Sequence, residues 1–145
     1  ANMTKALPDT TQPYDVNSDF RVQERLYEMR NESGKKTYQT YTKTHPVTGE
    51  VYSGRTSGTG TPAENVRKRD ANHHMNAKGF GPAVLDKTSD NYNAIRGREQ
   101  MLIDYHGGAK SVGGSSGNAI MGIGPNNKQG DTYINAAKGE FGEIE

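Results

Sequence analysis

Two polar segments with alternating side chains, separated by a short turn, constrain the fold of this 145-residue chain more than any other feature. Residues 36–44 alternate as a strand does, with side chains two positions apart sharing a face. Residues 45–49 contain the proline and glycine of a turn, and residues 50–56 form a second candidate strand. The pattern predicts an antiparallel β-hairpin that pairs Tyr41 with Tyr52 on one face.

This tyrosine pair has two interpretations. The two phenols could form one wall of a binding site, and Gly54 would then let a substrate backbone come close. Two aromatic rings across a hairpin can also simply pack against each other. The hairpin by itself leaves both interpretations open.

A helix is expected soon after the hairpin, because three start signals follow one another. Thr61 is suited to the N-cap, Pro62 to the first helical position, and Glu64 completes a capping box. We expect this helix to run to about Met75. Within it, Arg69 and His73 are four positions apart and would share a face.

The remaining elements predict a small α+β domain with a three-stranded antiparallel sheet flanked by helices. These elements are a helix at residues 15–30, a strand at 83–85, a helix that Ser89 or Asp90 caps and that runs to Tyr105, and a last helix at 132–141 after a cap at Asp131. Residues 1–14 are expected to be a linker or the cut edge of a larger protein, and residues 15–145 a single domain.

The composition narrows the classes of protein further. Only 30% of residues are hydrophobic and 18 are glycine, so we expect a small core with long loops. The absence of cysteine excludes disulfides and thiolate metal sites, and no apolar run is long enough to span a membrane. The net charge is +1, but residues 35–78 carry +5 and the rest −4. A basic centre suits a polyanionic ligand, although a solvated basic surface explains it as well.

Two groups of residues have the chemistry of a site. Arg69 could grip a phosphate while His73 moves a proton, and the alternative is a basic helix that is merely solvated. Glu99 lies on the apolar stripe of its helix, between Ile95 and Leu102. A carboxylate there is costly unless it binds a metal or pairs with a neighbouring arginine. The arginines considered for that pair are Arg96 and Arg98.

In their order and spacing, residues 38–127 resemble the GIY-YIG nuclease family. The elements that carry the resemblance are Gln39-Thr40-Tyr41, Tyr52-Ser53-Gly54, Arg69 with His73, Glu99 and a later asparagine. The resemblance implies a GIY-YIG-like fold and a catalytic site made of Tyr41, Tyr52, Arg69, His73, Glu99 and Asn118. Arg67 or Arg55 is the alternative to Arg69, and Asn126 is the alternative to Asn118.

The activity implied by this resemblance is metal-dependent hydrolysis of phosphodiester bonds, most of all in DNA, with RNA left open. Glu99 would hold Mg²⁺ or Mn²⁺, either tyrosine would position or deprotonate water, and Asn118 would order the site. The basic residues expected to contact the nucleic acid are Lys43, Arg55, Arg67 and Lys68. The alternatives are a nucleic-acid-binding module without catalysis and an interaction domain in which the tyrosines only pack.

Three further segments resemble C-terminal toxin domains of bacterial secreted or contact-dependent polymorphic toxins. They are Tyr-Ser-Gly-Arg-Thr at 52–56, Ala-Asn-His-His at 71–74, and Gly-Gly-Ser-Ser-Gly-Asn-Ala-Ile at 113–120. This second resemblance implies a monomeric effector that acts in the cytoplasm of a target cell, with no membrane partner. It also implies a cognate immunity protein.

Overall fold

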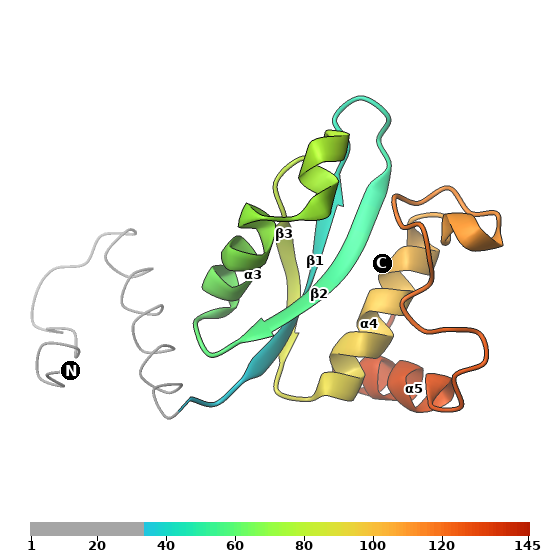
Figure 1. The fold of residues 1–145 in the computed structure, drawn as a ribbon. Helices are drawn as coiled ribbons and strands as arrows, with labels where there is room; N and C mark the ends of the chain where they lie inside the picture. The colour runs from blue at the N-terminus through green and yellow to red at the C-terminus, as the bar shows by residue number, and fades with distance from the viewer. Residues whose placement is uncertain (1–33) are drawn as a thin grey trace, which may run out of the picture.

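The computed structural model describes residues 34–145, so the expected linker at 1–14 and the expected helix at 15–30 lie outside the described residues. The described elements form one sheet with helices around it (Figure 1). In chain order they are β1 (Thr37–Thr44), β2 (Val51–Gly58), α3 (Pro62–Ala71), the 3-10 helix η1 (His74–Lys78), β3 (Val84–Ser89), α4 (Tyr92–Tyr105), the 3-10 helix η2 (Lys110–Val112) and α5 (Gly130–Phe141).

The sheet has three antiparallel strands, as expected, and their order is β2-β1-β3. The expected pairing of Tyr41 with Tyr52 is wrong, since Tyr41 lies opposite Gly54 and Lys43 lies opposite Tyr52. The cause is the loop at 45–50, which is one residue longer than expected and is closed by backbone hydrogen bonds of 2.9 Å. Because the register differs by two positions, both tyrosines keep the same face and become diagonal neighbours.

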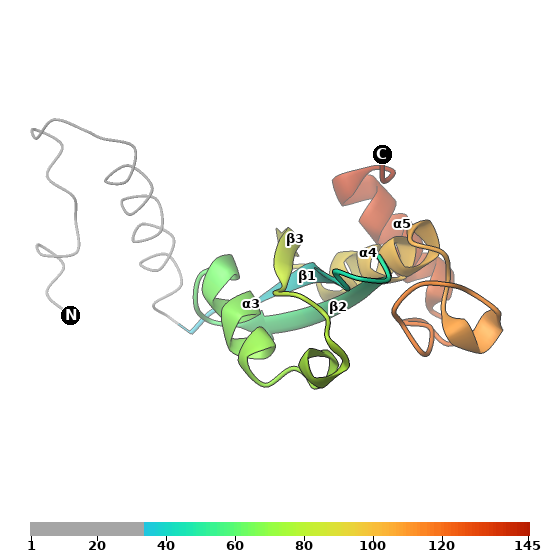
Figure 2. The same ribbon diagram turned by 90° about the horizontal axis from the view of Figure 1, so that it is seen from above.

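The two faces of the sheet are covered by different helices (Figures 1 and 2). Odd-numbered side chains of β1 point to α3, where Gln39 Oε1 accepts a hydrogen bond of 3.1 Å from Asn65. Even-numbered side chains point to α4, where the rings of Tyr38 and Tyr92 meet edge to face with centroids 5.5 Å apart. The α5 helix packs on α4. This arrangement confirms the expected α+β class with a sheet flanked by helices.

The start of α3 is as predicted, but its end is not. The amide of Glu64 donates to Thr61 Oγ1 at 3.1 Å, and the amide of Thr61 donates to Glu64 Oε1 at 3.0 Å, which completes the capping box. The helix ends at Ala71 because the chain turns to an extended conformation at His73, whose Nδ1 accepts the amide of Met75 and caps η1. The prediction of a helix to Met75 with His73 on it is therefore wrong.

The last two helices also begin at other residues than expected. Asn91, and not Ser89 or Asp90, caps α4, since its side chain accepts a hydrogen bond from the amide two residues on. Asp131 lies inside the first turn of α5, where its charge favours the helix dipole, and does not cap it. None of the helices between residues 34 and 145 is both long and apolar enough to cross a membrane.

Candidate functional site

Tyr41 and His73 form the buried centre of the site. Tyr41 is 1% exposed and His73 3%, and Tyr41 Oη lies 2.8 Å from His73 Nε2. Because His73 Nδ1 accepts the amide of Met75 at 3.1 Å, the neutral imidazole carries its proton on Nε2. Nε2–H therefore donates to the phenol oxygen, and the Tyr41 hydroxyl proton is left free to be donated elsewhere.

The electrostatic environment keeps both groups neutral at pH 7. Burial, and then the charge of Arg69, lower the pKa of His73 from 6.5 to about 4. Burial, and then the phenol of Tyr52, raise the pKa of Tyr41 well above its ordinary value. A protonated tyrosine held by a neutral histidine is a hydrogen-bond donor, not a base.

Tyr52 completes this aromatic cluster from the edge strand β2. Its ring meets His73 edge to face at 5.0 Å and His74 at 5.6 Å, while the two imidazoles stack at 4.6 Å. A Cβ atom on Gly54 would lie 2.5 Å from Tyr41 Oη and 3.0 Å from the ring of Tyr52. The space over Gly54 is thus filled by the two phenols, and the expectation that it admits a substrate backbone is wrong.

The charges of two groups on different helices shift the pKa values of the two phenols. The positive charge of Arg69 on α3 lowers the pKa of Tyr41, Tyr52 and His73, and the negative charge of Glu99 on α4 raises the pKa of both tyrosines. Burial is the main reason that the pKa of Tyr52 is raised. Arg69 makes no ion pair with another residue in the range 34–145, so its guanidinium is free to meet an anion.

Glu99 is buried at 9% exposure, as its place on the apolar stripe predicts. Its partner is Arg55 of β2, whose Nε donates to Glu99 Oε1 at 3.1 Å, and not the neighbouring arginines that the sequence suggested. Arg98 instead holds Asp86 with two hydrogen bonds of 2.8 and 3.1 Å. Burial raises the pKa of Glu99, and Arg55 offsets part of that rise.

The donor set around Glu99 meets part of what a divalent metal requires. No group of three histidine, cysteine or acidic side chains able to hold a metal gathers within residues 34–145. A Mg²⁺ ion at a phosphate site, however, needs only one or two carboxylates and keeps several waters. Glu99 fits that lesser requirement, because Arg55 occupies Oε1 and no other residue of the described range hydrogen-bonds the carboxylate. A Cβ on Gly122 would lie 2.6 Å from Oε1, so the glycine there is what leaves room for the carboxylate.

Asn118 supports the site without facing it. Its side-chain oxygen accepts from the amide of Ser53 at 2.8 Å, and its NH₂ group donates to the carbonyl of Ser53 at 2.8 Å. Ser53 lies between Tyr52 and Gly54 on the outer edge of β2, so the amide of Asn118 takes the place of a missing neighbouring strand. Asn126, the alternative, is exposed in a loop.

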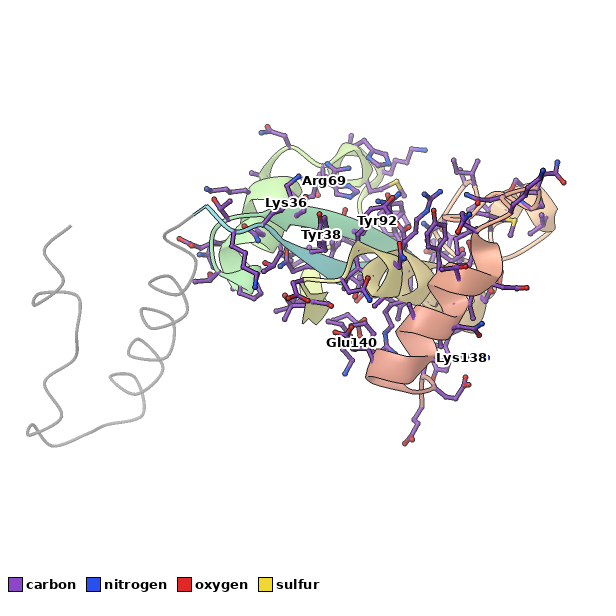
Figure 3. All side chains as sticks on the ribbon, turned by 90° about the horizontal axis from the view of Figure 1, so that it is seen from below. Lys36, Tyr38, Arg69, Tyr92, Lys138 and Glu140 are labelled. Atoms are coloured by element: carbon purple, nitrogen blue, oxygen red, sulfur yellow. The ribbon has the colours of Figure 1, made fainter. Side chains whose placement is uncertain are left out.

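The basic residues expected to contact nucleic acid differ in their surroundings. Lys43 is a wrong prediction, because its side chain is fully buried, ion-paired with Asp70 and hydrogen-bonded to Asn76 at 2.7 Å. Arg67 and Lys68 are exposed on α3. Arg55 is half-buried and lines a groove of about 410 Å³ together with residues such as Lys36, Tyr38 and Tyr92, which Figure 3 labels.

Sequence reasoning missed two members of the cluster. Asp70 anchors Lys43 and accepts the amide of Ala83 at 3.1 Å, and these contacts lower its pKa although burial opposes them. His74 stacks on His73 and contacts Tyr52. The adjacent histidines were a visible signal for His74, whereas Asp70 could be found only from the fold.

The geometry therefore brings Tyr41, Tyr52 and His73 into contact and adds the charges of Arg69 and Glu99. Asn118 lies against the outer edge of β2. Such a site can bind an anion, donate a hydrogen bond to it and hold a cation beside it. Comparison of the chain with protein-family models, with curated proteins and with solved structures found no match in any of the three.

Proposed function

We propose that this domain is a metal-dependent endonuclease that hydrolyses phosphodiester bonds, most of all in DNA. The observation that carries the proposal is that the charges of Arg69 and Glu99, from two helices, act on the same two phenols, the buried Tyr41 and the half-buried Tyr52. A cation, an anion and hydroxyl donors in one place are what phosphoryl transfer needs, because its transition state accumulates charge on the phosphate oxygens. The resemblance of the sequence to the GIY-YIG family supports the same activity.

The roles of the residues follow from their protonation states. Arg69 binds the phosphate and neutralises the charge that develops on it. The Tyr41 hydroxyl donates its proton in a hydrogen bond to a phosphate oxygen or to the attacking water, since His73 Nε2–H occupies its oxygen lone pair. Of the two roles expected for the tyrosines, this favours positioning of water by Tyr41. His73 orients the phenol and does not accept its proton.

The proposed activity includes Mg²⁺ or Mn²⁺, which Glu99 would hold through the oxygen that Arg55 leaves free. When bound, such a cation supplies Lewis-acid stabilisation of the phosphate and lowers the pKa of a bound water. The positive charge of Arg55 favours the ionised form of the buried carboxylate and holds it in place. Arg55, Arg67 and Lys68 would contact the flanking phosphates.

The test is cleavage of plasmid DNA and of a structured RNA with Mg²⁺, with Mn²⁺ and with chelator. Glu99→Gln keeps the side-chain shape and removes the anion, and we expect it to lower the rate at least about 100-fold. The matched control is Glu140→Gln, because Glu140 is exposed on α5, far from Arg69 in Figure 3, and should cleave as the wild type does.

Each other outcome has a distinct meaning. Metal-dependent cleavage that survives Glu99→Gln refutes the assignment of the metal to Glu99. A salt-sensitive gel shift of DNA without cleavage favours the alternative, a non-catalytic nucleic-acid-binding module. If the chain neither cleaves nor binds nucleic acid, the remaining interpretation is an interaction domain in which the tyrosines only pack.

We further propose, from sequence resemblance, that the domain is the toxic part of a secreted or delivered bacterial effector. It would act as a monomer in the cytoplasm of the target cell, and a cognate immunity protein would block its basic face. Expression inside a bacterial host should then stop growth and degrade DNA, and Glu99→Gln should relieve both effects. Growth arrest that persists with Glu99→Gln would contradict nuclease toxicity.

A further inference from the structure

A cavity of about 320 Å³ adjoins the candidate site and shares Tyr52 with it. The side chains of His45, His74 and Phe80 also line this cavity, and Lys78 and Lys110 stand among its exposed residues. Its volume lies within the usual range for sites that bind small molecules. Of these side chains, only Tyr52 and His74 belong to the cluster described above.

Aromatic side chains supply the apolar surface of the cavity. Phe80 is 9% exposed and meets the imidazole of His45 edge to face, with centroids 5.2 Å apart. A Cβ atom on Gly117 would lie 2.8 Å from the ring of Phe80, so the glycine lets the loop close tightly against that ring. Phe80 is thus a covered wall of the cavity, and the aromatic surfaces that a nucleobase can reach are the half-buried ring of Tyr52 and the exposed imidazole of His74.

The polar groups of the cavity include both hydrogen-bond donors and hydrogen-bond acceptors. His45 Nδ1 accepts the amides of Val47 and Thr48 at 3.1 and 3.2 Å, so the neutral ring carries its proton on Nε2 and can donate it. Glu50 Oε2 holds Lys110 at 2.7 Å, and its carboxylate can still accept. A pocket for a bare anion would not contain a carboxylate, whereas the edge of a nucleobase presents donors and acceptors together.

We propose that this cavity binds one unpaired nucleobase of the substrate, next to the phosphate held at Tyr52 and Arg69. The domain therefore acts on single-stranded or locally unpaired nucleic acid, because a base within a duplex cannot enter the cavity and present its face to the rings of Tyr52 and His74. The inference rests on the proposed function for the position of the scissile phosphate. Lys78 and Lys110 contact the phosphates on either side of the bound base.

The experiment is fluorescence anisotropy of the full chain in chelator, so that binding is measured without cleavage. The probes are a labelled 12-nucleotide single strand, its duplex, and single strands with one abasic position moved along the sequence. We expect the single strand to bind more tightly than the duplex, and one abasic position to weaken binding roughly tenfold. His74→Ala should lose the same factor on the intact single strand and be indifferent to the abasic site, because it removes the exposed ring.

The control variant is His106→Ala at the end of α4, which removes an imidazole outside the cavity and should leave the affinity unchanged. Equal affinity for duplex and single strand, or an abasic scan without any sensitive position, overturns the inference. The scan uses the wild-type chain, so it decides the matter even if His74→Ala fails to fold. Failure of the proposed function would instead appear as no cleavage of any nucleic acid, whatever the binding results are.

Discussion

The side chain of Asn118 offers the sharpest test of how the site is held, because its two hydrogen bonds to Ser53 have opposite polarity. Asn118→Ala leaves a buried amide and a buried carbonyl of Ser53 without partners. Each such group costs about 1–3 kcal/mol, so we expect the free energy of unfolding to fall by roughly 2–6 kcal/mol. With a urea dependence of about 2 kcal/mol per molar, the unfolding midpoint should fall by roughly 1–3 M.

Asn118→Asp distinguishes the hydrogen bonds from packing. The aspartate has the same shape, but its ionised carboxylate only accepts, so the carbonyl of Ser53 loses its donor and faces a negative charge. At pH 7 this variant should be at least as unstable as Asn118→Ala. Protonation restores a donor, and the pKa of the folded variant should therefore lie above the usual 3.9 of aspartate. Its deficit against the wild type should shrink as the pH falls through that raised value.

Unfolding in urea, followed by circular dichroism at pH 7 and at pH 4.5, measures both effects. Asn126→Asp is the matched control, since Asn126 is exposed and makes no side-chain hydrogen bond to any residue between 34 and 145. It should unfold like the wild type at both values. If Asn118→Asp is as stable as the wild type at pH 7, the reasoning about the edge of β2 is refuted.

Three further predictions follow from the same cluster. The pKa of His73 is lowered from 6.5 unfolded to about 4 folded, so its contribution to stability is complete above pH 6.5 and is lost as the pH falls toward 4. The loss is about 3 kcal/mol at most, and a His73→Gln variant should lack this part of the pH dependence of urea unfolding. Gly54→Ala places a methyl group 2.5 Å from Tyr41 Oη, so we expect at least a tenfold loss of cleavage and a lower thermal stability. Unchanged cleavage would show that the phenol can move freely. Arg55→Ala leaves Glu99 buried without the charge that favours its ionised form, so we expect Mg²⁺ to stabilise this variant less than the wild type. Mg²⁺ at ten times the wild-type Kd should add about 1.4 kcal/mol, or roughly 4–8 °C in Tm, to the wild type. Equal shifts of Tm in thermal scans of both proteins would argue against a metal at Glu99.

Local signals in the sequence predicted the local structure well. The capping box of Thr61 and Glu64 and the two hairpin strands depend on residues close in the chain, and they lie where they were expected. The hairpin register could not be predicted as safely, because it depends on how the loop at 45–50 closes. The end of α3 was missed for a related reason, since the competing cap is a hydrogen bond from the amide of Met75 to the side chain of His73, which helix propensity does not reveal.

The sequence predicted which residues belong to the site better than it predicted which residues they contact. Burial of Glu99 followed from its apolar neighbours, but its partner Arg55 comes from a strand 44 positions away and only the fold brings them together. Lys43 shows the same limit, because a lysine on a polar strand is usually exposed. Its burial depends on Asp70, 27 positions further along the chain, which offsets the cost of removing the charge from water.

These buried polar contacts also explain how a chain with only 30% hydrophobic residues can position a site. Lys43 with Asp70 ties β1 to α3, and Arg98 with Asp86 ties α4 to β3. Removal of one partner from such a pair leaves a buried charge, so the pairs define the orientation of each helix more narrowly than apolar packing would. Arg69 and Glu99 belong to those same two helices. The contacts that stabilise the fold therefore also set the positions of the two charges at the phenols.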